Sequence, residues 1–186
     1  AQIPMEALAP HHRAEVQDIL DRLDFQFQIH TQPQQVRLST VDRLYDRPRL
    51  AAAMWRSCAF VPTLYTVELP DKAFWVSDGR GLTGTMTLIH RRPGFRVYVA
   101  DGHVARGRMG NPIAVGAKMV TVYRYWEGPK GFETHLQTWT ALDSALLGFL
   151  SRPFRNYIQR RQEEFIGYIF HNIAQGGQDY ALAGGQ

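Results

Sequence analysis

Between Leu64 and Thr140 the sequence alternates apolar and polar residues instead of spacing its apolar residues as a helix does. Short stretches that favour turns, such as "DGRG" and "EGPKG", interrupt this alternation five times. Links this short join strands that run antiparallel and lie side by side. The region is therefore predicted to form an antiparallel meander of six strands. These strands are expected at residues 64–69, 73–78, 82–92, 95–106, 114–126 and 132–140.

Helical spacing of apolar residues flanks the meander on both sides. Residues 12–24 predict an amphipathic helix, and Pro48 suits the first turn of a short, buried helix that ends before Pro62. After Thr140 an apolar stripe predicts a C-terminal helix that reaches roughly 40 Å at ~1.5 Å per residue, enough to cross a sheet. The stripe contains Leu147, Leu150, Phe154, Ile158, Phe165, Ile169 and Ile173.

A further short strand is indicated before the meander, where Phe25, Phe27 and Ile29 alternate with polar residues. A twisted sheet must cover its apolar face, and the C-terminal helix carries the only long apolar stripe. The predicted fold class is therefore α+β, with a curved antiparallel sheet gripping the long C-terminal helix. The sheet has six strands, or seven if the additional strand joins it.

This order of elements, with "PRLAAAMWR" before the sheet and "LLGFLSRPFRNYIQRR" after it, resembles the START-like helix-grip superfamily. That superfamily includes polyketide cyclases, aromatase/cyclases and plant lipid-binding allergens. The resemblance implies an apolar cavity between sheet and helix, which in many members holds a lipid, sterol or polyketide. Accordingly, residues 1–35 are expected to form an N-terminal helix and linker, residues 36–174 the helix-grip domain, and residues 175–186 a flexible, glycine-rich tail.

Residues 118–140 are predicted to form a long hairpin with apolar residues on both faces. With a turn at 127–131, Val122 and Trp126 share a face with Leu136, and we expect this face to be concave and to meet the C-terminal helix. The opposite face would carry an aromatic patch, which either the N-terminal helix covers or a protein partner contacts. The patch contains Tyr123, Tyr125, His135 and Trp139.

The leading hypothesis is a non-catalytic protein that encloses a hydrophobic or lipid-like small molecule in this cavity, without a cofactor. Arg161 lies on the helix stripe, where a buried arginine needs a polar partner or must extend its head to water. One interpretation is that it binds the head group of an anionic amphiphile, so that Arg161→Leu would weaken binding but leave the fold intact. The predicted ligand-binding residues are Met86, Leu88, Val122, Trp126, Leu136, Phe154, Ile158, Arg161 and Phe165.

Two other classes of function share the same fold. In a cyclase-like or hydrolytic enzyme, Asp101 and His103 are two residues apart and hence on one face of a strand, where the carboxylate could orient the imidazole as a base. This interpretation requires both side chains to point into a cleft. In an interaction subunit of a larger assembly, the protein would instead dock a partner through Tyr123, Tyr125 and Trp139.

Metal and nucleic-acid chemistry are not favoured. The seven histidines show no paired spacing of metal ligands, so no metal site is predicted. The net charge of +4 suits anionic partners, but the basic residues are spread along the chain and accompany no aromatic consensus for RNA. No apolar run approaches the ~20 residues that span a bilayer.

The cellular compartment is open to two interpretations. The single cysteine, Cys58, cannot form an intrachain disulfide and so says nothing about redox conditions. The start "AQIPMEALAP" is compatible with a signal peptide cleaved after a small residue, or with a cytoplasmic protein that lost its initiator methionine. We favour the first, which predicts an exported or periplasmic protein.

Overall fold

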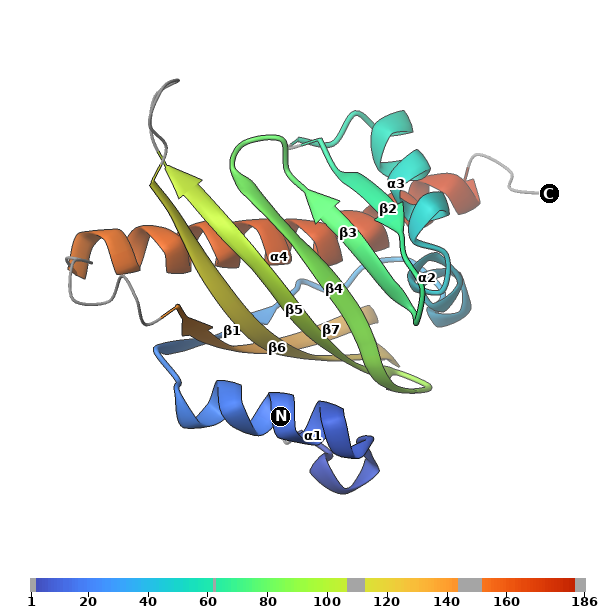
Figure 1. The fold of residues 1–186 in the computed structure, drawn as a ribbon. Coiled ribbons are helices and arrows are strands. Elements are labelled where there is room, and N and C mark those ends of the chain that lie inside the picture. The colour runs from blue at the N-terminus through green and yellow to red at the C-terminus, as the bar shows by residue number, and fades with distance from the viewer. Residues whose placement is uncertain (1–2, 62, 107–112, 144–151, 183–186) are drawn as a thin grey trace.

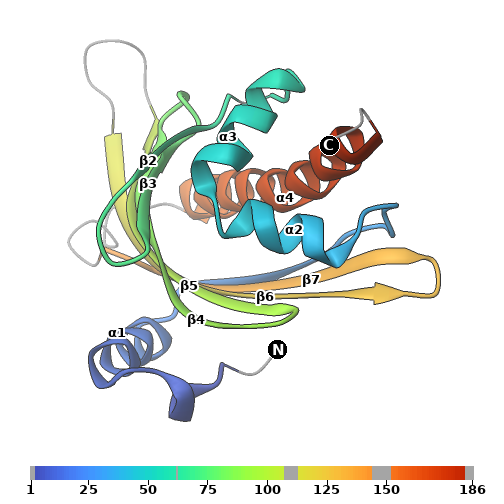
Figure 2. The ribbon, with the colours of Figure 1, turned by 90° about the vertical axis from the view of Figure 1, so that its right-hand side faces the viewer.

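The protein forms three layers in the computed structural model (Figure 1). Helix α1 (Pro10–Asp21) covers one face of a curved antiparallel sheet. Helices α2 (Leu38–Tyr45), α3 (Pro48–Ser57) and α4 (Arg152–Leu182) lie on the other face (Figure 2). Helix α4 crosses the concave side of the sheet, and α2 and α3 sit near its C-terminal end. The structure describes residues 3–61, 63–106, 113–143 and 152–182.

The sheet contains seven strands in the order β1-β7-β6-β5-β4-β3-β2, and every neighbouring pair is antiparallel. The six strands of the predicted meander are confirmed to within two residues at each end. The additional strand predicted before the meander is β1, and it pairs with β7 at one edge of the sheet. The strands are β1 (Phe25–His30), β2 (Tyr65–Glu68), β3 (Ala73–Ser77), β4 (Leu82–Arg92), β5 (Phe95–Arg106), β6 (Ile113–Gly128) and β7 (Gly131–Leu142).

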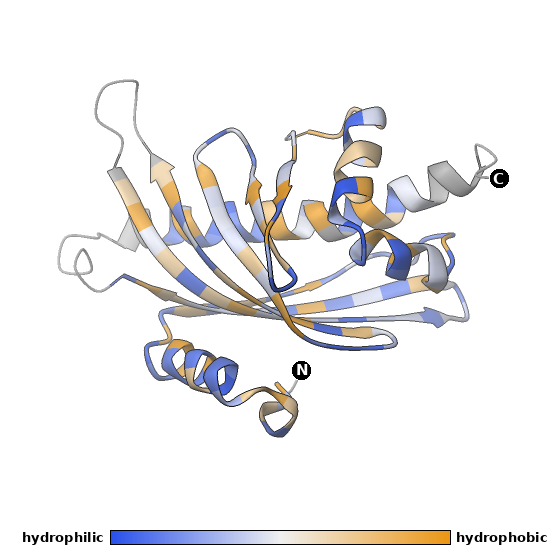
Figure 3. Ribbon diagram, turned by 45° about the vertical axis from the view of Figure 1, so that its right-hand side comes forward, coloured by the Kyte–Doolittle hydropathy of each residue, from blue (hydrophilic) through white to orange (hydrophobic). Residues whose placement is uncertain are grey.

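Successive side chains of a strand point to opposite faces of the sheet, and apolar residues at both sets of positions give each face its own core (Figure 3). On the convex face, Val16 and Ile19 of α1 are fully buried. They pack with strand residues that include Val97, Val120 and Val122. The predicted amphipathic helix thus covers the second face of the sheet. The concave face packs against α2, α3 and α4 through a larger cluster that includes Met54, Trp55, Met86, Tyr98, Phe132, Leu136 and Phe165.

The predicted pairing of the long hairpin is wrong by one residue. The β6–β7 connection is a two-residue turn, and Gly128 pairs with Gly131. Tyr123 is therefore opposite Leu136, whereas the expected turn at 127–131 places Val122 there. A shift of one residue moves every side chain of one strand to the other face of the sheet. Consequently, Tyr123 and Tyr125 of β6 face α4, and Val120 and Val122 face α1.

Helix α2 was not predicted, because its sequence lacks the usual start signal. The residue before it is Arg37, which makes no side-chain cap. The missing acceptor comes from the sheet instead: the backbone N–H of Leu38 donates to Glu127 Oε1 of β6 at 2.8 Å. A contact between residues far apart in sequence thus satisfies the helix terminus.

The expected division of the chain changes at both ends. Residues 25–30, placed in a linker, form the strand that pairs with β7. At the other end α4 continues to Leu182, so most of the predicted glycine-rich tail is helical. Gly176 and Gly177 are buried, and a Cβ on Gly176 would lie 2.6 Å from Met54 Cε. Glycine therefore serves here to let α4 approach α3 closely. Within the described residues, none of the helices combines the length and hydrophobicity needed to cross a lipid bilayer.

Candidate functional site

Two apolar hollows lie between the concave face of the sheet and α4. The first has a volume of about 50 Å³ and reaches α2 and α3, and the second has about 40 Å³ and lies under the middle of the sheet. Val76 and Met86 line both, so the two hollows adjoin. The first is also lined by Leu44, Ala51, Leu64, Phe74, Tyr98, Ile169 and Ile173, and the second by Leu82, Ala100, Val104, Met119, Gln162, Phe165 and Ile166.

A pair of facing glycines shapes the second hollow. Gly84 of β4 pairs with Gly102 of β5, at positions on the concave face of the sheet. A Cβ on Gly102 would lie only 2.3 Å from the backbone oxygen of Thr83 and 2.7 Å from Gly84 Cα. The two strands approach too closely here for any side chain, so this part of the cavity wall is bare backbone.

An open groove of about 410 Å³ forms the mouth of this cavity. It shares Tyr45, Pro48, Phe74 and Tyr98 with the first hollow. The groove is far more polar than the hollows, because charged residues from the end of α2, from β2, from the β2–β3 turn and from β4 border it. The groove and the two hollows thus form one continuous series of spaces, and their lining becomes more apolar with depth. The charged residues of the groove are Asp46, Glu68, Lys72 and Arg91.

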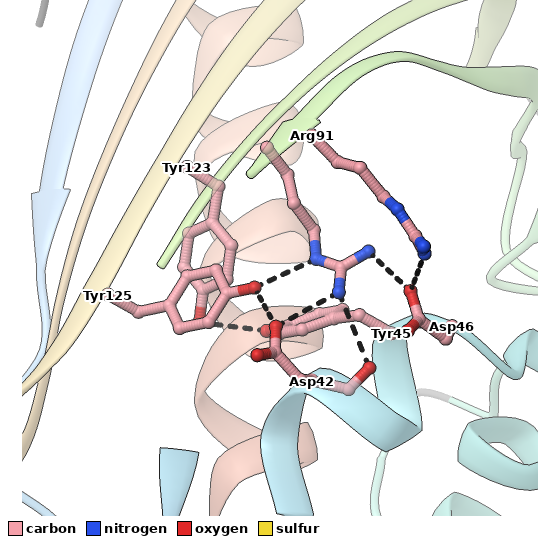
Figure 4. Close-up of polar contacts among 7 residues, drawn as sticks. Asp42, Tyr45, Asp46, Arg91, Tyr123 and Tyr125 are labelled. Carbon is pink, nitrogen blue, oxygen red and sulfur yellow. Dashed lines mark hydrogen bonds and ion pairs between the residues drawn. The ribbon is translucent and has the colours of Figure 1, made fainter. Parts of the chain in front are cut away.

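A buried arginine joins the sheet to α2 beside the mouth, and Figure 4 shows its partners Asp42, Asp46 and Tyr125. Arg96 of β5 is only 3% exposed. Its guanidinium donates to Tyr125 Oη at 2.9 Å, to Asp46 Oδ1 at 2.8 Å and to Asp42 Oδ1 at 3.0 Å. The Tyr125 hydroxyl in turn donates to Asp42. Burial opposes the charge on Arg96, yet its contacts with Tyr98, Tyr125 and Asp46 outweigh this effect and raise its pKa.

Four tyrosines line or support the inner end of the groove. Tyr45 of α2 donates its hydroxyl hydrogen to Tyr123 Oη at 2.8 Å, and the two rings meet edge to face. Burial raises the pKa of Tyr45, Tyr123 and Tyr125 well above the ordinary value. Burial also raises the pKa of Tyr98 to about 12, although the neighbouring Arg96 opposes this shift. All four hydroxyls thus remain protonated at neutral pH, which makes them hydrogen-bond donors rather than bases.

The raised pKa values predict how the tyrosines titrate. Four of the eight tyrosines carry a raised pKa, so these four should stay protonated near the ordinary pKa of ~10. We expect the ultraviolet tyrosinate signal to reach no more than about half of its final value at about pH 11, and to complete only on unfolding. A raised folded-state pKa stabilises the fold below the unfolded pKa, and this contribution is lost as pH rises through the folded pKa. Full ionisation of the folded protein near pH 10 would contradict the burial of these side chains.

The structure places part of the predicted ligand-binding set around the cavity. Met86 and Phe165 line the hollows, and Leu88 lines the groove. Leu136 and Ile158 lie on the side of the sheet that α4 covers, but outside the lining of either hollow. The side chain of Phe154 is outside the described residues.

Two members of that set lie on the wrong face of the sheet. Val122 is fully buried in the convex core beneath α1, and Trp126 of the same face is 42% exposed. The physical reason is the register of the β6–β7 hairpin. The expectation that they line the cavity is therefore wrong.

Arg161 has an ion-pair partner that the sequence did not predict. Its Nη2 lies 2.5 Å from Oδ2 of Asp78, whose side chain is fully buried in the β3–β4 turn. The other oxygen of Asp78 accepts hydrogen bonds from the backbone N–H groups of Arg80 and Leu82. The polar partner that a buried arginine needs thus comes from the protein itself, and Arg161 does not line the groove or either hollow.

The inward orientation that the acid/base hypothesis requires is not found. Asp101 and His103 alternate with Ala100 and Val104, which face α4, so their side chains lie on the convex face and both are exposed. His103 contacts the hydroxyl of Thr83 at 3.0 Å. Asp101 Oδ2 lies 3.9 Å from Lys118 Nζ. Both residues contribute to the lining of the second hollow on either side of Gly102, but their exposed side chains on the convex face form no acid/base pair within it.

The predicted aromatic patch does not exist as one surface. Tyr123 and Tyr125 are buried on the concave face, at 0% and 2% exposed. Trp139 belongs to the core beneath α1. The interaction-subunit hypothesis loses the surface on which it rested. Within the described part of the chain, no group of three or more potential ligand residues could hold a metal ion.

The sequence did not predict the residues around the mouth, because the fold brings them together from distant parts of the chain. Asp42 and Tyr45 come from the unpredicted α2, and Arg96 and Tyr125 come from two different strands. One signal was present: Arg96 interrupts the otherwise apolar inward positions of "FRVYVA". A charge at a core position indicates a buried partner, but the sequence does not say which.

Comparison with solved structures identifies the class of fold. The chain matches an uncharacterized protein from Rhizobium leguminosarum with 15% identity and a TM-score of 0.52, covering 83% of this chain and 95% of that one. It matches the di-domain ARO/CYC BexL from the BE-7585A biosynthetic pathway with 14% identity and a TM-score of 0.53, covering 89% of this chain and 53% of BexL.

A second di-domain ARO/CYC, StfQ from the steffimycin biosynthetic pathway, gives 14% identity and a TM-score of 0.54, over 91% of this chain and 56% of StfQ. The chain thus spans about half the length of each di-domain protein. No family model and no curated protein matches the sequence. The shared architecture is the helix-grip fold, an α+β fold with a curved antiparallel sheet around a C-terminal helix, as expected from the order of elements.

Proposed function

We propose that the protein binds a hydrophobic small molecule between the sheet and α4. The observation that carries the proposal is the continuous series from an open polar groove to two apolar hollows. Ligand sites of this kind bury an apolar body and hold its orientation with a few polar groups. The described site offers donors, the tyrosine hydroxyls at its mouth, but no inward acid/base pair, so the proposed function is binding rather than catalysis.

The size of the spaces indicates how a ligand would enter. The groove of about 410 Å³ is within the range of small-molecule sites, whereas the hollows of about 50 and 40 Å³ are not. A ligand would therefore rest in the groove and widen the hollows by displacing a side chain between them. Met86 is suited to this, because methionine is unbranched and adapts its shape at little cost.

The helix-grip fold of the ARO/CYC proteins from two biosynthetic pathways supports a ligand site in this position, without identifying the ligand. A lipid-like molecule satisfies the apolar lining as well as an aromatic one does. Residence in an exported compartment stays a prediction from the sequence.

Filling the junction between the hollows tests the proposal. Met86→Trp should lower the affinity for 1-decanol or 2-naphthol at least tenfold, because the indole occupies the space that the ligand needs. Calorimetry and native mass spectrometry measure the binding, and solvent extraction of the purified protein shows whether it already carries a ligand. The matched control is Val67→Trp on β2, which is 51% exposed and outside the cavity lining.

Circular dichroism and thermal melting establish that both variants are folded. If Met86→Trp does not fold, Ala100→Val is a milder change that fills the second hollow. A folded variant that binds these probes as tightly as the parent would contradict the proposal. So would a parent protein that carries no ligand and binds neither probe.

A further inference from the structure

Among the residues that the structure describes, one cation at the rim of the groove has no acidic partner. Asp46 is shared between Arg96 and Arg91, with both nitrogen–oxygen separations at 2.8 Å. Glu68 pairs with Arg49 at 3.2 Å. No ion pair to Lys72 occurs among the described residues.

The charges around the mouth therefore do not cancel. Counting the charged groove residues, their ion-pair partners and Asp42, which also pairs with Arg96, four cations face three carboxylates, which leaves a net charge of +1. Arg91 does not have a carboxylate to itself, because it shares one oxygen of Asp46 with the buried Arg96. The cations are Arg49, Lys72, Arg91 and Arg96, and the carboxylates are Asp42, Asp46 and Glu68.

The backbone holds Lys72 at this rim in a conformation that lysine rarely adopts. Asp71 and Lys72 have φ angles of +57° and +59°, in the left-handed region that favours glycine. The turn is closed by a hydrogen bond from Ala73 N to Pro70 O at 3.1 Å. The carbonyl of Lys72 also accepts a hydrogen bond from Leu88 N at 3.2 Å, which ties the turn to β4 beside the groove. The turn therefore carries strain that glycine would relieve, and lysine at this position is not explained by stability.

We propose that the groove binds the anionic head group of a monomeric amphiphile, with its carboxylate between Lys72 and Arg91. This inference rests on the proposed function and specifies its ligand class. Phe74 and Leu88 border the same groove, and Phe74 also lines the first hollow, so an alkyl tail would pass inward over apolar side chains. Arg91 can turn to the ligand without leaving Asp46 unpaired, because Arg96 stays bound to it.

The head-group site is thus at the opposite end of the cavity from the one first expected. Arg161 pairs with Asp78 near the start of β4, whereas Lys72 and Arg91 lie at the other end of β4. A charge-assisted contact with an exposed lysine contributes about tenfold in affinity.

The test compares decanoate with 1-decanol, which have the same chain length and differ in charge. Lys72→Gly removes the cation and relieves the turn, so the variant should be at least as stable as the parent. It should bind decanoate about tenfold more weakly and decanol unchanged. Lys72→Arg should keep the preference for decanoate. The matched control is Asp71→Gly, which relieves the same kind of strain in the same turn and keeps the cation.

The outcomes separate this inference from the proposed function. If the parent binds decanol and decanoate and Lys72→Gly lowers neither affinity, the head-group site is overturned while the hydrophobic cavity stands. If the parent binds neither probe, both are overturned. Loss of binding to anionic vesicles in Lys72→Gly, with unchanged affinity for monomeric decanoate, would show a membrane contact instead and would also overturn the inference. An equal loss of decanoate affinity in Asp71→Gly would assign the effect to the shape of the turn.

Discussion

Replacing Arg96 with methionine is expected to lower the free energy of unfolding by about 3 kcal/mol. The guanidinium is 3% exposed and bonds Asp42, Asp46 and Tyr125 at once, so its removal leaves Asp42 without its cation and Asp46 with Arg91 alone. The cost lies at the low end of the range for buried pairs, because the two carboxylates are partly exposed, at 29% and 40%. Urea denaturation measures the change.

Two variants show whether the geometry or only the charge matters. Arg96→Lys keeps the charge but cannot bond three groups in different directions, so most of the loss should remain. Arg92→Met, on the neighbouring strand, removes an exposed arginine that lies 4.6 Å from the ring centre of Phe95 and should cost less than about 1 kcal/mol. A loss below about 1 kcal/mol for Arg96→Met would mean that the network contributes little to stability.

The same substitution should also affect binding. Asp42, Tyr45 and Asp46 belong to α2 and the residue after it, and Arg96 holds this segment against the sheet. Without that contact the tyrosine hydroxyls at the mouth lose their fixed positions. We expect Arg96→Met to weaken ligand binding even at temperatures where the variant is folded.

Replacing Arg161 with leucine is expected to destabilise the protein by about 3 kcal/mol. The change strands the carboxylate of Asp78, which is fully buried, whereas Arg161 itself is 21% exposed. This expectation replaces the one from the sequence, in which the variant kept its fold intact. Thermal and urea denaturation of the variant measure the loss.

The stranded charge itself can be removed as a control. Adding Asp78→Asn to Arg161→Leu should restore more than about 1 kcal/mol, because the amide oxygen can still accept the hydrogen bonds from Arg80 N and Leu82 N. Arg160→Leu, one residue earlier and exposed, should change stability by no more than about 0.5 kcal/mol. If the double variant is no more stable than Arg161→Leu, the buried charge is not the cause of the loss.

Local pattern was sufficient for the strands and for three of the helices, α1, α3 and α4. Alternation with short turns located β2 to β7, and the long apolar stripe located α4, because these signals arise within a few residues of each other. The same reasoning failed at α2, whose N-terminus is completed by Glu127 from β6. It also failed at Gly176 and Gly177, which were predicted to belong to a flexible tail. Their role in close helix packing is evident only when the neighbouring helices are known.

The candidate site depended on the register of one hairpin. In the observed β6–β7 pairing, which differs from the expected one by a single residue, Tyr123 and not Val122 lies on the concave face. A polar network therefore stands where an apolar wall was expected. The sequence is compatible with the expected turn at 127–131 and with the observed two-residue turn. Both faces of β6 carry apolar or aromatic residues, so alternation alone does not select one of the two registers.

By itself, the sequence determined the α+β class, the antiparallel meander and the helix that lies across it, because hydrophobic periodicity and turn residues act locally. Only the tertiary structure decided which side chains face the cavity and which charges are already paired. Arg161 and Lys72 look alike as basic residues near an apolar segment. The fold gives the first a buried carboxylate and leaves the second at the mouth of a groove with no ion pair among the described residues. The reason is physical: whether a charge is free for a ligand depends on neighbours brought together across the whole chain.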